Sequence, residues 1–401
     1  MPAPRPARLL DVDAAELASL APTELAGPLL LVARVDGVPV GSLIVEDGAQ
    51  PDAPPADAVT WRTGDPLPGP VDAAIGITVA VCTRDRPELL RRCLDAVRVA
   101  VEHAGPEVVA TLLVVDNASA DDRTAAVGSA AGALVAREDV PGLDVARNRA
   151  RTMLTTEVLA FVDDDVVVDP TWLRTLARTF AAHPDAAAVT GGVLAAVVDT
   201  GARFEFERCG GFFKGWDAAT LDGANRDDLP FNPSIGVGCN MAFRARTLDA
   251  MGPFDDALDT GPPLAGGGDL DALLRAAMVG PVVYEPSSMV RHEHRATMAQ
   301  LRHQYRSWGT SWGAVLHKWY RRAPDDRAVI RRAAARSLRH YLHDLLLPGR
   351  PGRRRRGHAG LLLIGFATGT TIAYPRSQRR MAERRRTAHD ASLAARRRAR
   401  T

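Results

Sequence analysis

The stretch 159-LAFVDDDVVVDP-170 places three aspartates, Asp163 to Asp165, directly after an apolar run. The run has the character of a buried β-strand. Adjacent carboxylates repel one another, so their position needs an explanation: a polar turn closed by Asp169-Pro170, or a site for a divalent cation, which we favour. In an extended segment Asp163 and Asp165 point the same way, and two carboxylates on one face suit Mg²⁺ or Mn²⁺.

Strands and helices alternate along the sequence on both sides of this stretch. The run 75-IGITVAVCT-83 is continuously apolar, as a strand buried on both faces requires. A helix is predicted to follow it, with a capping-box-like pair, Asp85 and Glu88, and one apolar face of Leu90, Leu94, Val97 and Val101. Residues 111–122 and 280–295 give further strands. This order predicts an α/β fold with a mostly parallel sheet covered by helices.

Three of the predicted strands end in polar clusters. These clusters are Thr83-Arg84-Asp85, Asp116-Asn117 and the three aspartates. Ligands of open α/β sheets bind at the carboxyl ends of the strands, so we expect a site there. The Asn117 amide offers a donor and an acceptor together, which suits a nucleobase or ribose, although Asx residues also end many strands.

Other candidates for chemistry lie in the second half of the chain and before the aspartates. In 266-GGGDLDALLRAAMVG-280, Asp269 is either the N-cap of a helix or a general base. Arg147, near the start of another predicted helix, holds a phosphate or belongs to a solvated face. His292 and His294 share one side of an extended segment and are metal ligands or surface residues.

Charge is distributed unevenly over the 401 residues. The net charge is only +2, but from Arg350 onward arginines are numerous and the acids are just Glu383 and Asp390. Such a tail is a solvated segment or binds anionic lipid or nucleic acid, and lipid is favoured because the apolar stretch 359–374 lies between arginines. That stretch is an interfacial helix or a core helix.

The chain divides into three predicted parts. Residues 1–70 form a small β-containing appendage, with a hairpin at Asp36-Gly37 and a proline-rich linker at 49–58. Residues 71–300 form the main domain, and 301–401 a helical, Arg-rich extension. The four cysteines have no metal-ligand spacing and read as reduced, buried side chains of a cytosolic protein. We expect no signal peptide and no membrane span.

Several motifs are absent: GxGxxG after the first strand, GxxxxGK[ST] and GxSxG. Hydride-transfer enzymes, P-loop proteins and α/β-hydrolases therefore lose support. Taken in order, six segments of the sequence resemble glycosyltransferase family 2, which has the GT-A fold. These segments are "VAVCTRDRPELLRRCLDAV", "LLVVDNASADD", "ARNRAR", "FVDDDVVVDPTWL", "GCNMAFRARTLDAMGPFDDAL" and "GGGDLDALLRAAMVGPVVYEP". The resemblance spans about residues 75–295.

This resemblance implies an inverting transfer from a nucleotide-diphosphate sugar donor with a Mn²⁺ or Mg²⁺ cofactor. By matching motif, Asp163 and Asp165 are the metal candidates and Asp269 is the catalytic base; His292, from the histidine pair, is a further metal candidate. The donor-binding candidates are Thr83, Asp85, Asp116, Asn117, Arg147 and Asp164. The implied acceptor is a glycan or a lipid-linked glycan of the cell envelope, at an anionic membrane surface contacted by the Arg-rich tail. Nucleic acid is not an expected partner, and the expected location is cytoplasmic, peripheral at the inner membrane face.

One position departs from the family pattern. Relatives often carry an acidic residue immediately before the base, and here that position is Gly268, which leaves Asp271 as the fallback. Two rival interpretations are a sugar-nucleotide nucleotidyltransferase and a non-catalytic, membrane-associated binding protein. A nucleotidyltransferase would have a Gly-rich loop after the first strand, and "CTRDRPEL" has no such glycines. Only Gly268 favours the non-catalytic binding protein.

Overall fold

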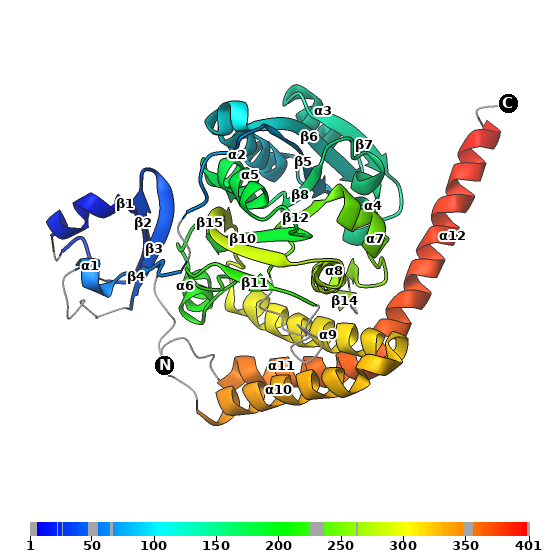
Figure 1. Ribbon diagram of the computed structural model, residues 1–401. Helices are drawn as coiled ribbons and strands as arrows, with labels where there is room; N and C mark the ends of the chain where they lie inside the picture. Colours follow the sequence, from blue (N-terminus) through cyan, green and yellow to red (C-terminus); the bar gives the residue numbers. More distant parts are fainter. Residues whose placement is uncertain are drawn as a thin grey trace.

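A computed structural model describes residues 6–46, 55–64, 67–223, 236–261, 264–347 and 356–398, apart from positions 22 and 26. It is an α/β protein in which a central sheet lies between helices, with a small sheet on one side and a helical layer beneath (Figure 1). Most of the proline-rich linker predicted at 49–58 falls outside the described residues, and its end forms the short helix α1 (Pro55–Ala58).

The central sheet is mixed, with parallel strands at its heart. Its order is β11-β15-β10-β12-β8-β5-β6-β7, and β9 pairs with β15. β5 pairs in parallel with both β6 and β8, whereas β12 runs antiparallel between β8 and β10. The bounds are β5 Ile75–Thr83, β6 Val108–Asn117, β7 Leu134–Glu138, β8 Val158–Asp163, β9 Val166–Val168, β10 Ala188–Ala195, β11 Ala219–Leu221, β12 Asn240–Arg244 and β15 Val282–His292.

Helices cover both faces of this sheet, as the continuous apolar strands predicted. Alternate residues of β5 show the two cores: Val79 and Val81 pack with α2 (Pro87–Ala104) and α5 (Trp172–Ala182). Ala80 and Cys82 pack with the helices of the opposite face. These are α4 (Leu143–Thr152), α7 (Ala245–Met251) and α8 (Gly268–Ala277). α3 (Arg123–Ala130) lies beside α2, and α6 (Gly201–Arg208) follows β10.

The predicted N-terminal appendage is a separate four-stranded sheet, β1 (Arg8–Asp13), β2 (Leu29–Val35), β3 (Val38–Val45) and β4 (Thr60–Trp61). Asp36 and Gly37 both have positive φ, as a two-residue hairpin turn requires. Arg34 reaches across to Asp169, the residue after β9 (2.6 Å), and Arg62 pairs with Glu285 of β15. The division of the chain at residues 70 and 300 into domains stays a prediction.

The C-terminal extension is helical. Its elements are α9 (Met298–Arg322), α10 (Arg327–Leu346), α11 (Arg356–Thr368), a π-helical turn η5 (Gly369–Ala373) and α12 (Tyr374–Arg398), which projects from the body in Figure 1. α9 and α11 pack backbone to backbone: a Cβ on Gly309 would lie 2.2 Å from the Leu362 oxygen, and one on Gly365 2.1 Å from the Arg306 oxygen. No helix in the described ranges is both long and apolar enough to traverse a bilayer.

The expected capping box of α2 is wrong. The N-cap is Arg86, which makes no side-chain cap, and the helix begins with Pro87 instead. Asp85 has a positive φ of 56° and its carboxylate accepts from the Ala120 N–H (2.7 Å), so it fastens the loop after β6 rather than the helix.

Candidate functional site

The polar strand ends come together as expected. In register, Thr83 of β5 lies beside Asp116 of β6, and Cys82 lies beside Asp163 of β8. A cleft of about 470 Å³ opens at this edge. Its polar lining comes mostly from the strand ends and from residues after β15, and includes Thr83, Arg84, Arg86, Asn117, Asp163, Asp164, Asp165, His292, Arg295 and Arg384.

Asp163 is the last residue of β8, and Asp164 and Asp165 form the turn into β9, so the expectation that strand alternation aligns Asp163 and Asp165 is wrong. Each of the two nevertheless lies near His292, the last residue of β15. Asp165 Oδ1 is 3.3 Å from His292 Nε2, and the ligand atoms of Asp163, His292 and Cys239 all lie within 4.8 Å of one another.

The electrostatics of this cluster fit a hard divalent cation. Burial raises the pKa of Asp163 to about 7, against the opposing effect of Arg147 and with added repulsion from Asp165. Burial, with repulsion from His294, holds the pKa of His292 well below its ordinary value, so its ring is neutral and able to ligate.

One atom of the cluster is orphaned. Asp165 Oδ1 is buried and has no hydrogen-bond partner in the described part of the chain. Burial raises the pKa of the Cys239 thiol well above its ordinary value, so Cys239 stays protonated without a metal. Asp163, Cys239 and His292 are close enough to share one ion, and Asp165 adjoins them through His292. The assignment of Asp163, Asp165 and His292 to Mn²⁺ or Mg²⁺ stays a prediction, which their carboxylate and imidazole donors suit.

Asp164, between the two metal candidates, is held by neighbouring side chains. Its Oδ2 accepts from Thr83 Oγ1 (2.7 Å), and its Oδ1 accepts from Arg86 Nη1 (3.0 Å). Arg86 is also 3.5 Å from Asp165 Oδ2. These bonds fix the acidic turn to the end of β5.

Asp116 and Asn117 shape the loops around the cleft. Asp116 accepts from Arg137 (2.6 Å) and from the Ser119 N–H (3.1 Å). The Asn117 amide donates to the Val140 oxygen and accepts from the Gly142 N–H, each at 2.8 Å. Asn117 and Thr83 line the cleft, whereas Asp116 and Asp85 are not among its lining residues. Their predicted contacts with the donor remain predictions.

Asp269 is the predicted N-cap of α8, but it lies in the first turn, two residues after the observed cap. The cap is Gly267, with a φ of 104°, so the N-cap prediction is wrong. Asp269 Oδ2 instead accepts from the Gly238 N–H and Oδ1 from its neighbour, the Leu270 N–H, each at 2.8 Å. A Cβ on Gly238 would lie 2.8 Å from both Asp269 Cβ and Arg147 Nη2. Only glycine therefore fits that loop position without displacement.

A buried ion pair lies between the base candidate and the aspartates. Arg147 Nη1 donates to Asp144 Oδ1 (3.0 Å), and Arg147 Nη2 is 4.0 Å from Asp163 Oδ1. Both side chains of the Asp144–Arg147 pair are at most 3% exposed. Sequence reasoning missed Asp144, although it lies three residues before Arg147. The phosphate-binding role of Arg147 remains a prediction, and the partners described here are carboxylates.

Asp144 also accounts for the departure at Gly268. A Cβ on Gly268 would lie 1.7 Å from Asp144 Oδ2 and 2.4 Å from Asp144 Cγ. The space next to Asp269 is thus filled by a carboxylate that comes from α4 instead of from the preceding residue. The Gly268 position therefore has no room for any side chain while Asp144 keeps its place.

The fallback base, Asp271, is enclosed. It is 0% exposed and accepts from Lys318 Nζ (2.7 Å), Arg275 Nε (2.9 Å) and Trp319 Nε1 (3.1 Å). It holds α8 against α9 and does not reach the cleft. Asp269 is partly exposed but is likewise not among the residues that line the cleft, so its role as the base stays a prediction.

The sequence did not predict three arginines that line the cleft: Arg86, Arg295 and Arg384. Arg86 stands in the quoted stretch "CTRDRPEL", where its charge was the available signal. Arg384 comes from α12 and donates to the Pro141 oxygen (2.8 Å). Nothing local in the sequence indicates that contact.

Two other features lie outside the cluster. His294 shares one side with His292, as expected, but its Nε2 contacts Glu207 Oε1 at 2.5 Å, which makes it a structural residue.

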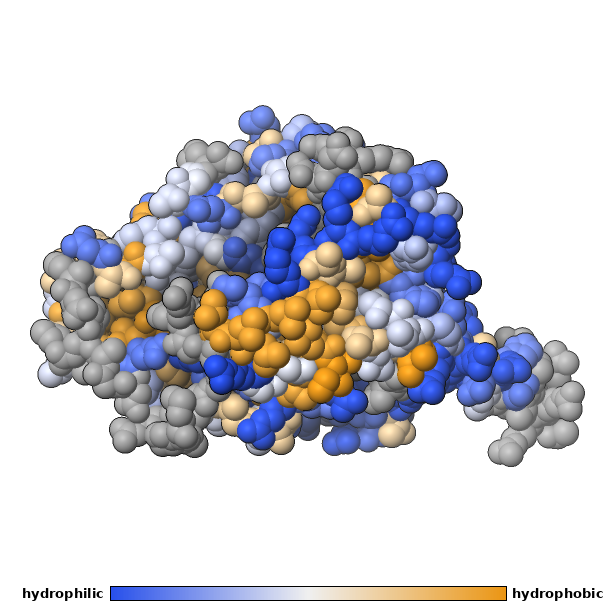
Figure 2. All heavy atoms as spheres, turned by 90° about the horizontal axis from the view of Figure 1, so that it is seen from below, coloured by the Kyte–Doolittle hydropathy of each residue, from blue (hydrophilic) through white to orange (hydrophobic). Residues whose placement is uncertain are grey.

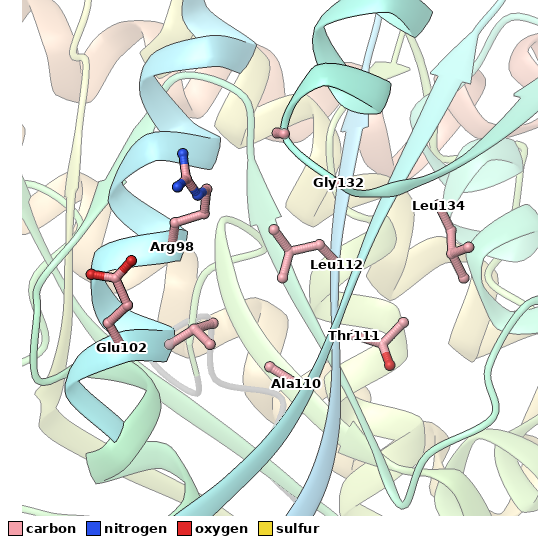
Figure 3. A pocket seen from close by; sticks show the side chains of 9 residues that line it. Arg98, Glu102, Ala110, Thr111, Leu112, Gly132 and Leu134 are labelled. Carbon is pink, nitrogen blue, oxygen red and sulfur yellow. The ribbon is translucent and has the colours of Figure 1, made fainter. Parts of the chain in front are cut away.

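A further cavity of about 380 Å³ lies between α2, β6 and the segment after α3 (Figure 3). Its residues Ala110 to Leu112 are in the first half of β6, away from Asp116, so it is separate from the cleft.

Comparisons with known proteins bear on this arrangement. A family model described as "Glycosyltransferase like family 2" matches residues 74–311. The glucosyl-dolichyl phosphate glucuronosyltransferase of Haloferax volcanii is 38% identical over 53 residues, a match that covers 13% of this chain and only 17% of that relative.

Similar solved structures include the glucosyl-3-phosphoglycerate synthase of Mycobacterium tuberculosis, which is 17% identical, with 62% of this chain and 81% of that chain covered and a TM-score of 0.41. The complex of that synthase with Mn²⁺, uridine diphosphate and glucosyl-3-phosphoglycerate is 18% identical, with 62% and 80% covered and a TM-score of 0.41. A further mycobacterial protein is 19% identical, with 61% and 73% covered and a TM-score of 0.40.

The family model spans more than half of the chain and includes the strand ends, the acidic turn and α8. The sheet flanked by helices is the GT-A arrangement that the sequence predicted. The chain belongs to the glycosyltransferase-like family 2.

Proposed function

We propose that this protein transfers a sugar from a nucleotide-diphosphate sugar to an acceptor hydroxyl, with inversion at the anomeric carbon. The observation that supports the proposal is that Asp163 and His292 meet at the carboxyl edge of the sheet, with Asp269 close enough to add to the raised pKa of Asp163, in a chain of glycosyltransferase family 2. The non-catalytic alternative rests on Gly268 alone, and the nearby Asp144 carboxylate supports a catalytic site that lacks an acidic side chain at that position.

Asp163, Asp165 and His292 would hold the divalent cation. A bound Mn²⁺ or Mg²⁺ supplies positive charge where a departing diphosphate becomes negative. The metal-binding side chains are held in place before the metal binds. Arg86 and Thr83 fix the turn through Asp164, and the His292 ring is neutral. Fixed donors need little reorganisation when the ligand binds.

Arginines complete the donor site. Arg86, Arg295 and Arg384 line the cleft and present guanidinium groups, which bind phosphate oxygens in paired hydrogen bonds. Thr83, Asp85, Asp116, Asn117, Arg147 and Asp164 remain proposed donor-binding residues, and Asn117 shapes the loop at residues 140–142 against which the donor would lie.

Asp269 is the proposed general base. Hydrogen bonds from the Gly238 and Leu270 N–H groups orient its carboxylate without consuming all its lone pairs. It takes the proton of the acceptor hydroxyl while that oxygen attacks the anomeric carbon from the side opposite the diphosphate. The bond from the sugar to the diphosphate breaks as the new glycosidic bond forms.

A glycan or lipid-linked acceptor of the cell envelope remains our proposal. The short match to an enzyme named for a dolichyl phosphate substrate supports a lipid-linked one. An acceptor of that kind places the protein at an anionic membrane surface, peripheral to the cytoplasmic face, and the arginines of the C-terminal extension suit that position.

The test is Asp269→Asn, assayed for transfer and, separately, for binding of nucleoside diphosphates in the presence of Mn²⁺. Loss of a general base lowers turnover by about 100-fold to 10,000-fold, while donor binding stays near the unaltered level. Asp249→Asn, an exposed residue on α7, is the matched control. Full turnover in Asp269→Asn would remove it as the base, and absence of nucleotide binding in the unaltered protein would overturn the function.

A further inference from the structure

The face formed by α10 and α11 is unusually apolar for an exposed surface. Leu338, Leu342 and Leu346 of α10 recur every four residues, so they form one stripe, and their side chains are 43%, 41% and 69% exposed. Ile364 of α11 is 53% exposed and Ile372 of η5 is 44% exposed. Figure 2 shows an apolar patch on the face seen from below, with hydrophilic residues along its edges.

α11 is apolar on both its inner and its outer side. Its inner side packs on α9, where Leu362 and Phe366 are buried beside the close glycine contacts. The half-buried Leu361 and Leu363 pack against the same cluster, and the outer side carries the exposed Ile364 and Ala367. A helix that only served the core would be polar on its outer side, so this surface calls for a further partner.

The same helices are strongly basic around the patch. α10 has exposed Arg331, Arg332, Arg336 and Arg339, and Arg356 starts α11. The one acidic residue in the sequence of α10, Asp344, is 1% exposed, so it adds little negative charge to the surface. The exposed surface of α10 thus combines leucine with arginine.

We propose that the α10–α11 face binds an anionic lipid bilayer, with its leucines and isoleucines at the boundary of the acyl chains and its arginines at the headgroups. Leucine flanked by cations is the chemistry of helices that lie in the membrane interface, because long arginine side chains reach the phosphates while their stems cover apolar surface. A protein partner would have to supply a matching acidic group for each of these exposed guanidinium groups, whereas anionic headgroups are abundant in a bilayer. The proposal deepens the proposed membrane location and identifies the surface responsible.

The experiment is flotation of the full-length protein with vesicles of phosphatidylcholine alone or mixed with phosphatidylglycerol. We expect binding only to the mixed vesicles, and weaker binding at high salt because ions screen the arginines. Arg336→Gln and Arg339→Gln should each lower the partition coefficient by about fivefold. Leu342→Ser with Leu346→Ser should lower it by about tenfold or more, because two exposed apolar side chains are lost.

Matched controls come from α2, on another part of the surface. Arg98 and Val99 are exposed there, and Arg98→Gln and Val99→Ser should leave vesicle binding unchanged. Thermal unfolding of each variant shows that the fold is kept, which is expected because all four altered residues of α10 are exposed.

Three results would overturn the proposal: no binding of the unaltered protein to mixed vesicles, equal loss in the α2 controls, or a concentration-dependent dimer that the leucine substitutions abolish while vesicle binding persists. Vesicle binding is measured without a donor or an acceptor. A protein that binds vesicles but transfers no sugar would therefore contradict the proposed function but not the proposed lipid-binding surface.

Discussion

Gly268→Ala is the most informative small change in the candidate site. The added methyl group would occupy the position of the Asp144 carboxylate, at 1.7 Å from Oδ2 and 2.4 Å from Cγ, so one of the two groups must move. Asp144 is 0% exposed and bonded to Arg147, which itself is 3% exposed, so there is little free space for it to enter. The substitution therefore acts on the ion pair rather than on Asp269 directly.

The magnitude follows from what the pair does. If Asp144 shifts but keeps its bond to Arg147, the cost is that of overpacking, about 1–3 kcal/mol of unfolding free energy. If the pair separates, a buried charge loses its partner and the cost rises to about 3–5 kcal/mol. Because a distance of 1.7 Å is far inside van der Waals contact, we expect a value near the boundary of these ranges, about 3 kcal/mol.

The assay is a double-mutant cycle in urea with Asp144→Ala. Asp144→Ala alone should cost about 3–5 kcal/mol, since it leaves Arg147 buried without this carboxylate. Adding Gly268→Ala to it should cost almost nothing more, because the carboxylate that clashed is gone. The two changes would then be non-additive by at least about 1 kcal/mol. Gly268→Asp in the Asp144→Ala background should recover part of the loss by returning a carboxylate to Arg147.

Gly360→Ala is the control, because a Cβ there meets nothing within 4 Å and alanine favours a helix. It should leave stability unchanged or slightly raised. The reasoning is refuted if Gly268→Ala unfolds like the unaltered protein, or if the costs of Gly268→Ala and Asp144→Ala simply add.

Three further outcomes are expected. His292→Ala should weaken Mn²⁺ binding by more than about tenfold, measured by calorimetry, with His294→Ala acting mainly on stability. Arg384→Ala should weaken nucleoside diphosphate binding by about tenfold, because a charged donor leaves the cleft, whereas exposed Arg386→Ala should not. Burial raises the pKa of Asp255, but its bonds with Lys318 and Tyr374 outweigh burial and lower the pKa below its ordinary value near 3.8. Asp255 therefore stabilises the fold above pH 3.8, and this contribution is lost as the pH falls through the lowered pKa. Asp255→Asn should flatten the acid side of a curve of unfolding free energy against pH.

The sheet and the place of the site were predictable because they follow from local pattern and parallel topology. The apolar run of β5 had to be buried on both faces, and Thr83 and Asp116 then had to meet at one edge. The same logic located the acidic turn, although it gave the wrong reason for the convergence of Asp163 and Asp165. The two aspartates share His292 as a neighbour because β15 pairs with β9, which brings His292 beside the turn.

The remaining features depend on contacts between distant segments. Asp144 replaces a side chain at Gly268 only because α4 and α8 approach closely on one face of the sheet, and no local pattern encodes that distance. Arg384 reaches Pro141 from the far end of the chain for the same reason. The N-cap of α8 was misplaced by two residues because three consecutive glycines offered several equivalent starts, and a left-handed Gly267 took the position.

The continuity of α11, η5 and α12 has a consequence for regulation. One uninterrupted helical segment starts at Arg356 on the apolar face and carries Arg384 to the rim of the cleft. If lipid binding at one end shifts this segment and changes donor affinity at the other, thermodynamic reciprocity requires the donor to change lipid affinity by the same factor. A comparison of vesicle binding with and without a nucleoside diphosphate measures that factor and its sign.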